Sequence, residues 1–309
     1  MASTILRQTI IMLILISTGI VCSKTKVISK ETNKELSKFV LQVVNPIVIL
    51  MAYQTEYKPE LVRNLLLTFG LSVLAYAIMI GAAYLLIRNK DGRETAIERF
   101  SAIYSNCGFM GIPLMKALFG NEGVFYLTAF ITVFNLIVWT HGIILISGEK
   151  NLKQVVKVFY SPTIIAIVLG IIMFFARIKI PSIPSDALNF IADLNTPMAM
   201  IVSGVTMADT NIPALLKKGG IYYISLLKMI VIPIILILAL SLFDIDEKVR
   251  LTVIVASAAP PAAMCTLQCI RYNKNSLYAS EIFTAGTILS VITLPVIVKI
   301  AEKIGCILN

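Results

Sequence analysis

Residues 105–113 read SNCGFMGIP, and residues 256–264 read ASAAPPAAM. Each segment interrupts a long apolar stretch near its middle with glycine or proline, the residues that loosen or break a helix. In lipid, backbone groups freed in this way are tolerated only inside protein or beside a water-filled cavity. The two segments therefore predict two broken helices that cross each other near the middle of a bilayer.

The composition supports a membrane environment. Hydrophobic residues make up 58% of the 309 residues and charged residues only 14%, whereas a soluble domain has roughly 45–50% and about 25%. A chain of this length has ample surface for charge, so the shortage implies that most of its surface faces lipid. The net charge of +10 comes from short runs of Lys and Arg between apolar stretches. This pattern is typical of membrane-protein loops and does not predict a nucleic-acid partner.

Ten apolar stretches are long enough to span a bilayer, which takes about 20 residues in a helix. Their connections are short and leave no room for a separate soluble domain. The sequence therefore predicts an all-α integral membrane protein with ten transmembrane helices. The predicted spans are Ile5–Val21, Leu36–Tyr53, Leu61–Ile87, Ile97–Leu118, Gly123–Ile146, Val155–Ala176, Ala187–Met207, Ile221–Phe243, Val249–Ile270 and Leu277–Ile300.

The distribution of positive charge predicts the orientation. Arg7 lies near the start of the first apolar run and five lysines follow that run, the reverse of a secretory signal peptide. With the N-terminus outside, sixteen Lys and Arg residues fall in inner loops and ten in outer segments, as the positive-inside rule requires. We therefore expect a multi-pass protein of the cell (plasma) membrane with both termini outside.

Irregular positions recur in matching spans of the two halves. Asn45-Pro46 lies in the second span and Asn195-Thr196-Pro197 in the seventh, while the two segments quoted above lie in the fourth and ninth. Because each half has an odd number of spans, two similar halves would be inverted in the membrane. The alternative is that glycine and proline are simply common in membrane helices and that packing absorbs the kinks. We predict inverted repeats over residues 1–147 and 148–309, with further helix breaks at Asn45, Pro46, Thr196 and Pro197.

A helix that restarts in mid-membrane offers unpaired N–H groups and the positive end of its dipole. The two inner half-helices are expected to begin near Gly108 and Pro261. Helix ends of this kind favour anions. The sequence therefore predicts that a small organic anion binds where the two broken helices cross.

The auxin efflux carrier family is similar to this chain in five segments: NCGFMGIPL (106–114), FNLIVWTHG (134–142), SPTIIAIVLG (161–170), TPMAMIVSGVTMAD (196–209) and KMIVIP (228–233). The resemblance covers nearly the whole chain, in order. The family includes plant auxin exporters and bacterial permeases for malonate or malate. This chain lacks the long central cytoplasmic loop of many plant members, which indicates the bacterial type.

The resemblance implies a fold like that of the bile-acid sodium symporters. In that fold the first, second, sixth and seventh helices form a scaffold, through which dimers assemble. The other helices form a mobile domain that moves like an elevator. Plant auxin carriers bear an intramembrane aspartate on the third helix, whereas Leu61–Ile87 contains no acidic residue, so the role of that aspartate is not transferred.

Substrate-binding candidates follow from the same comparison. The resemblance implies that Asn106, Gly108, Gly111 and Pro113 belong to the first crossing segment, Pro260 and Pro261 to the second, and Asn135 to a polar position on the fifth helix. Cys107 and Ser257 are candidates as polar neighbours of these positions.

Three titratable side chains fall inside predicted spans: Glu281, His141 and Lys228. A charge near the bilayer centre costs about 2.5–3.5 kcal/mol, so each of them needs a reason. One hypothesis is that Glu281, alone or with His141, is a protonation or cation site, and that Lys228 neutralises the substrate or holds a helix end. The alternative is that Lys228 snorkels and that a structural hydrogen bond satisfies Glu281.

These observations favour a secondary transporter for a small carboxylate, with an elevator-type alternating-access mechanism. A proton gradient, a sodium gradient or the gradient of the substrate itself would drive it. A passive anion channel is the first alternative. An intramembrane lipid-modifying enzyme is the second, but it would need clustered carboxylates or a nucleophile–base pair. No metal, cofactor or disulfide framework is predicted, because the chain has a single histidine and five irregularly spaced cysteines.

Overall fold

The computed structural model describes residues 1–89, 94–148, 160–208, 210, 215 and 218–308, with the side chains of residues 305–308 left aside. These residues form helices, with no strand among them, and the π-helices are labelled η. The first half contains α1 (Ala2–Lys24), α2 (Lys30–Phe39), η1 (Val40–Val44), α3 (Asn45–Ala52), α4 (Pro59–Leu86), α5 (Thr95–Ile103), η2 (Cys107–Gly111), α6 (Ile112–Ile137), η3 (Val138–Gly142) and α7 (Ile143–Ser147). The second half contains α9 (Pro162–Phe175), α10 (Ser182–Asp193), α11 (Asn195–Met207), α13 (Gly219–Leu226), η4 (Leu227–Val231), α14 (Ile232–Leu240), α15 (Glu247–Ala258), α16 (Met264–Arg271) and α17 (Ser276–Leu308).

Seven helices in the described part of the chain are long and apolar enough to cross a membrane. They confirm the prediction of a helical, multi-pass membrane protein. These seven are Ala2–Lys24, Lys30–Ala52, Pro59–Leu86, Cys107–Ser147, Ser182–Met207, Gly219–Leu240 and Ser276–Ile304.

The number seven differs from the ten predicted spans for reasons visible in the chain. Cys107–Ser147 joins part of the predicted fourth span to the fifth, with a kink at Gly120, whose φ of 61° and ψ of −144° are not helical. The sixth predicted span is represented by α9, which has 14 residues, and residues 155–159 of that prediction lie outside the described residues. The ninth predicted span is divided into α15 and α16.

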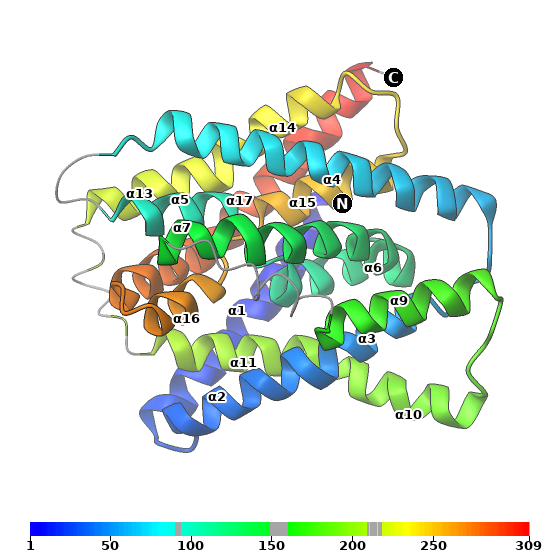
Figure 1. Cartoon of the computed structure of the whole chain (residues 1–309), viewed down its shortest axis with the longest axis horizontal. Helices are drawn as coiled ribbons and strands as arrows, with labels where there is room; N and C mark the ends of the chain where they lie inside the picture. The colour runs from blue at the N-terminus through cyan, green and yellow to red at the C-terminus, as the bar shows by residue number, and fades with distance from the viewer. Residues whose placement is uncertain (90–93, 149–159, 209, 211–214, 216–217, 309) are drawn as a thin grey trace.

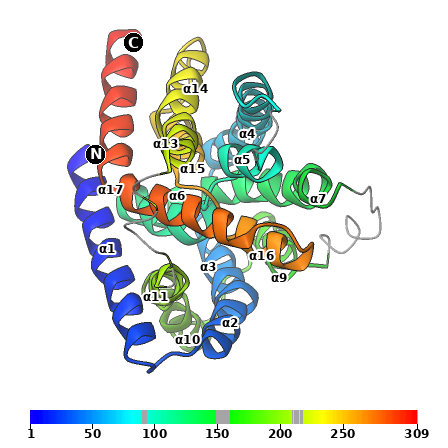
Figure 2. The ribbon, with the colours of Figure 1, turned by 90° about the vertical axis from the view of Figure 1, so that its left-hand side faces the viewer.

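The helices form two groups (Figures 1 and 2). Helices α2, α3, α10 and α11 gather in the lower part of both views, and α4, α13 and α14 gather in the upper part. Helix α1 packs along α11, and α9 packs against α3, so both belong with the lower helices. We call these six helices the α11 group, and we call α4–α7 with α13–α17 the α4 group.

Two glycines bring α1 and α11 together. A Cβ atom placed on Gly19 would collide with the carbonyl oxygen of Ile201, and one placed on Gly204 would collide with that of Ile16. Small residues at a helix crossing allow backbones to approach closely, which is the usual basis of helix packing in membranes. The two helices are therefore in backbone-to-backbone contact.

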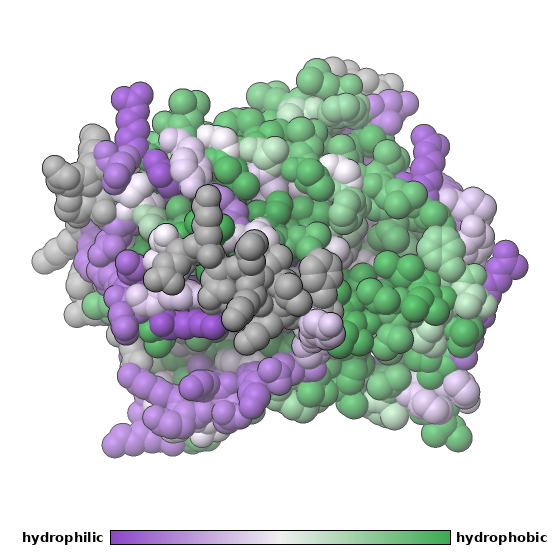
Figure 3. Space-filling model, in the orientation of Figure 1, coloured by the Kyte–Doolittle hydropathy of each residue, from purple (hydrophilic) through white to green (hydrophobic). Residues whose placement is uncertain are grey.

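The surface has the polarity expected of a protein that crosses a membrane. The face in Figure 3 shows a broad hydrophobic area between hydrophilic side chains at its left and right ends. The helices run mainly along this left-to-right axis (Figure 1). Exposed apolar side chains such as Leu66, Ile172 and Leu238 are more than half exposed, and such a surface is suited to lipid.

The expected break in the second span is not seen, since helix continues from Lys30 to Ala52. The seventh span is divided beside the expected position, where α10 ends at Asp193 and α11 begins at Asn195. In the first case η1 lies directly before Asn45 and Pro46, and a π-turn widens the helix where a proline ring would otherwise meet the preceding carbonyl. In the second case Thr196 and Pro197 lie in the first turn of α11, where a missing N–H removes no helical bond.

Candidate functional site

The segments that contain residues 105–113 and 256–264 lie side by side. Helix α5 ends at Ile103 and α15 ends at Ala258. The backbone N–H of Asn106 donates to the carbonyl oxygen of Pro260 at 2.8 Å, and the N–H of Ala262 donates to that of Tyr104 at 2.9 Å. We call residues 104–106 the first interruption and residues 259–263 the second interruption. Each therefore supplies one donor and one acceptor to the other, as buried backbone requires.

The neighbouring helix α17 is shaped to admit the second interruption. A Cβ atom on Gly286 would collide with Cδ of Pro261 and would lie 3.5 Å from Cβ of Pro260. Only a residue without a side chain fits at this position. The pairing of the two interruptions therefore depends on a third segment far away in the sequence.

The half-helices that follow the interruptions start at different distances from them. Helix η2 begins at Cys107, one residue before the predicted start at Gly108. Helix α16 begins at Met264, three residues after Pro261, near which its start was predicted. The reason is local: Pro260 and Pro261 have no N–H, and the N–H of Ala262 is used by Tyr104.

The two half-helices offer amides at their starts. The N–H of Met110 donates to Asn106, so the amides of Cys107, Gly108 and Phe109 precede it. In the second half, Cys265 donates to the carbonyl of Ala262, so the amides of Ala263 and Met264 precede it. Amides at the start of a helix have no acceptor within it. Both starts are therefore possible sources of N–H groups for an anion.

Three polar side chains at or near the interruptions have no partner. Nδ2 of Asn106, Oγ of Ser257 in the last turn of α15 and Oδ1 of Asn45 are buried and have no hydrogen-bond partner among the described protein atoms. Asn45 comes from the other helix group, and its Nδ2 would be 3.8 Å from a Cβ on Gly108. Since buried polar atoms are nearly always hydrogen-bonded, these atoms are candidates to bind a polar guest.

The remaining substrate candidates pack within α6 and its extensions. A Cβ on Gly111 would lie 3.5 Å from Cβ of Cys107 and from Cδ2 of Leu127. Pro113 is buried in the first turn of α6. The Nδ2 of Asn135 donates to the carbonyl of Ile131 in its own helix at 2.8 Å, so its amide is engaged there.

Lys228 reaches the broken end of α5. Its side chain is fully buried on η4, and its Nζ donates to the carbonyl oxygen of Ile103 at 3.1 Å. The C-terminal end of a helix carries partial negative charge and unpaired carbonyls. Lys228 therefore holds a helix end, as one hypothesis predicted, and it does not snorkel.

Glu281 and His141 belong to separate networks. Both carboxylate oxygens of Glu281 lie 2.6 Å from Nζ of Lys218, at the start of α13. His141 lies between two hydroxyls, with Nδ1 2.8 Å from the hydroxyl of Tyr104 and Nε2 3.2 Å from that of Tyr84. The alternative of a structural partner for Glu281 therefore holds, although the partner is an ion pair.

A second ion pair, between Glu122 and Lys248, was not predicted from the sequence. Oε2 of Glu122 lies 2.7 Å from Nζ of Lys248, and its Oε1 accepts from the hydroxyl of Tyr126 at 2.9 Å. Glu122 lies just before the predicted fifth span, and Glu281 lies near the start of the tenth. This matching position in the two halves was the available signal.

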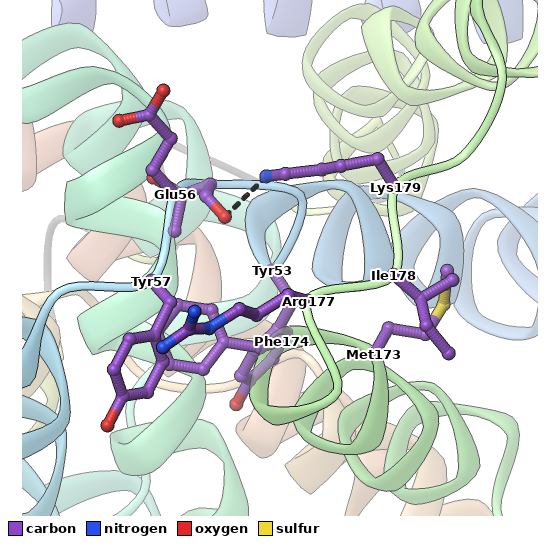
Figure 4. Close-up of a pocket in the computed structure, with 9 residues that line it drawn as sticks. Tyr53, Glu56, Tyr57, Met173, Phe174, Arg177, Ile178 and Lys179 are labelled. Atoms are coloured by element: carbon purple, nitrogen blue, oxygen red, sulfur yellow. Dashed lines mark hydrogen bonds between the residues drawn. The ribbon is translucent and has the colours of Figure 1, made fainter.

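A cavity with a volume of about 340 Å³ lies where the ends of α3 and α9 meet, away from the interruptions (Figure 4). The guanidinium of Arg177 lies 5.0 Å from the centre of the Tyr57 ring, and Nζ of Lys179 donates to the carbonyls of Gln54 and Thr55. None of the substrate candidates lines it.

Comparison of the sequence with known protein families identifies the family of this chain. The profile of a family described as membrane transport protein matches residues 4–157 and 150–298. The chain belongs to this membrane transport protein family. The resemblance to the auxin efflux carriers is thereby confirmed, and the protein is a transporter and not an enzyme.

Relatives of this transporter extend over nearly its whole length. A protein of Methanothermobacter thermautotrophicus named "Uncharacterized transporter" is 24% identical over 92% of this chain and 94% of its own. One of Methanocaldococcus jannaschii, also named "Uncharacterized transporter", is 26% identical over 90% and 93%. A protein of Rhizobium meliloti named "Putative malonate transporter" is 22% identical over 84% and 83%. These names place the family in transport without fixing a shared substrate.

Proposed function

We propose that this transporter is a secondary carrier of a small organic anion, a mono- or dicarboxylate such as malonate. The observation that carries the proposal is the pair of buried, unpartnered donor atoms, Nδ2 of Asn106 and Oγ of Ser257, at the paired interruptions. A carboxylate accepts hydrogen bonds only. The amide Nδ2 of Asn106, the hydroxyl of Ser257 and the N–H groups at the start of η2 are donors, so their chemistry matches such a guest.

Charge at the site supports an anion. The starts of η2 and α16 present the positive ends of their helix dipoles beside the interruptions. Lys228 adds a buried positive charge that satisfies the carbonyl of Ile103. Its side chain is fully buried and its Nζ is bound to the end of α5. We therefore assign Lys228 to support of the broken helix and not to substrate binding. The malonate named for the Rhizobium meliloti relative is a dicarboxylate of the proposed class.

The movement we propose is an elevator between the two helix groups. Residues 1–147 and 148–309 would form inverted repeats of five spans each, with broken fourth and ninth spans. The α11 group would be the scaffold, and the α4 group would carry the substrate. Asn45 on the scaffold would then meet Gly108 on the moving group only in some states. We further propose a homodimer through the scaffold, in the plasma membrane, with both termini outside.

Transport of [14C]malonate into proteoliposomes tests this function. We expect saturable uptake by the wild type and counterflow, in which unlabelled malonate inside accelerates entry of label. The Asn106→Ala variant should take up malonate at least about tenfold more slowly at low malonate concentration. It loses two hydrogen bonds of about 1 kcal/mol each, and a tenfold change in affinity corresponds to about 1.4 kcal/mol. The matched control, Asn121→Ala, changes an amide outside the candidate site.

The same assay separates the proposal from its alternatives. A passive channel would conduct without saturation and without counterflow, and that outcome would contradict a carrier. A screen of other mono- and dicarboxylates by thermal shift, with and without sodium, identifies the preferred substrate, because a ligand that binds the folded state raises its apparent stability. If no carboxylate were taken up or bound, the organic-anion assignment would be wrong.

A further inference from the structure

The single histidine of the chain lies between two tyrosines near the first interruption. His141 is on the π-helix η3, an element often found at functional sites. Its Nδ1 is 2.8 Å from the hydroxyl of Tyr104, and its Nε2 is 3.2 Å from the hydroxyl of Tyr84. Both ring nitrogens therefore have a partner that is able either to donate or to accept a hydrogen bond.

The network allows one simple arrangement of these bonds. The hydroxyl of Tyr104 also lies 3.2 Å from the carbonyl oxygen of Ile137, which accepts only. When Tyr104 donates to Ile137, it accepts from Nδ1–H of His141, and Nε2 accepts from Tyr84. A second proton on Nε2 reverses only the Tyr84 bond, since that hydroxyl then accepts. The cluster holds the neutral and the protonated imidazole with the same number of hydrogen bonds.

One side of the cluster is connected to the substrate site. The carbonyl of Tyr104 accepts the N–H of Ala262 in the second interruption. A Cβ on Gly142, the residue after His141, would lie 3.1 Å from the rings of Phe100 and Tyr104. This tight packing means that a shift of η3 displaces Tyr104, and with it the first interruption.

The other side reaches the surface. Tyr84 is 43% exposed. The guanidinium of Arg99 lies 4.2 Å from the centre of the Tyr84 ring. The titratable groups in contact with His141 are Tyr84 from α4 and Tyr104, which follows α5; Arg99 of α5 contacts the ring of Tyr84. Helix α16 packs against α7, and its Arg271 lies over the ring of Tyr272.

We propose that His141 accepts and releases the proton that accompanies the substrate anion, exchanging it with solution beside Tyr84. This inference rests on the proposed carrier function and names its driving ion. The proton binds Nε2 as the anion binds at the interruptions, and both leave on the other side of the membrane. Histidine is suited to this role because its charge changes between about pH 5 and pH 8. Glu281 is paired with Lys218, so we do not assign the proton to it.

Proteoliposomes with an imposed pH gradient test the proposal, in sodium-free buffer and with the membrane potential clamped at zero. One pH unit supports up to about tenfold accumulation of [14C]malonate if one proton accompanies each anion. We expect this accumulation from the wild type and from the control Tyr222→Phe. The His141→Gln variant keeps hydrogen-bonding groups but takes up no proton, so it should show counterflow without gradient-driven accumulation.

The outcomes are distinguishable. Counterflow by the wild type without accumulation under the gradient would overturn the proton site and leave the carrier intact, whereas absence of both would overturn the carrier itself. Accumulation by His141→Gln equal to the wild type would also overturn the proton site. If His141→Gln does not fold, Tyr84→Phe decides: slower gradient-driven accumulation with unchanged counterflow supports the proposal, and unchanged accumulation contradicts it.

Discussion

The two interruptions occupy equivalent places in the crossing but are built differently. The first has polar and small residues, with Asn106 followed at once by η2. The second has Pro260 and Pro261 and reaches α16 only at Met264. Each gives one N–H and one carbonyl to the other. Beyond that exchange, the first offers the side-chain amide of Asn106, and the second offers a rigid proline pair with the hydroxyl of Ser257 just before it.

This difference indicates a division of labour. Proline fixes its own φ and restricts the residue before it, so the second interruption holds its shape without help from hydrogen bonds. The first interruption lacks that restraint and is held by partners: Pro260 on one side and Lys228 at the carbonyl of Ile103 on the other. We infer that the second interruption is the rigid wall and the first is the recognition surface.

The largest expected effect comes from disturbing the wall. In Gly286→Ala, the new Cβ would collide with Pro261, and overpacking of this kind costs about 1–3 kcal/mol. We expect a clear loss of thermal stability in detergent, together with loss of malonate uptake. The matched control is Gly81→Ala, where a Cβ would meet nothing within 4 Å. Equal stability of the two variants would show that the second interruption is not rigidly packed.

A smaller effect should separate the two interruptions as recognition surfaces. Ser257→Ala removes one hydroxyl near the second interruption, so we expect malonate affinity to fall by only about two- to fivefold, consistent with one hydrogen bond of about 0.5–1 kcal/mol. Asn106→Ala should cost more than this. Titration of purified protein with malonate by calorimetry measures both. A larger loss for Ser257→Ala than for Asn106→Ala would reverse the proposed division.

The smallest expected effects concern the ion pairs in the two halves. The Glu281 side chain is 4% exposed, whereas that of Glu122 is 33% exposed. Exposed ion pairs contribute about 0–1 kcal/mol, and loss of a buried partner costs more. We therefore expect Glu281→Gln to lower thermal stability more than Glu122→Gln. Neither should change gradient-driven accumulation per folded protein, and a selective loss in Glu281→Gln would contradict the assignment of the proton to His141.

The sequence predicted structure well at positions where a residue alters the helix through its own backbone. The proline pair marks the second interruption because proline removes an N–H, whereas Gly108 and Gly111 lie in η2, just after the first interruption. The apolar stretches likewise predicted a helical membrane protein. The pairing of Asn106 with Pro260 was expected only as a crossing; its hydrogen bonds depend on positions that no local pattern specifies.

Asn45-Pro46 shows where the same reasoning fails. The prediction treated this proline like those at the interruptions, but η1 absorbs it and the helix continues. The same arrangement occurs before Pro113 and Pro233, which follow η2 and η4. Whether a proline breaks a helix or widens it depends on tertiary packing around the turn, and that is why Asn45-Pro46 was misjudged as a break, whereas a helix boundary does lie just before Thr196.

The close approach of Gly19 and Gly204 has a consequence for the distance that any moving part can travel. With α1 and α11 locked together, displacement must be taken up by the connecting segments, and residues 53–58 are one of these. Lys179 clamps the carbonyls of Gln54 and Thr55, which leaves four Cα–Cα steps from Thr55 to Pro59, a reach of at most about 14 Å. In the proposed elevator motion, a displacement larger than this would require Lys179 to release both carbonyls first. Lys179 would then limit the distance that the α4 group moves.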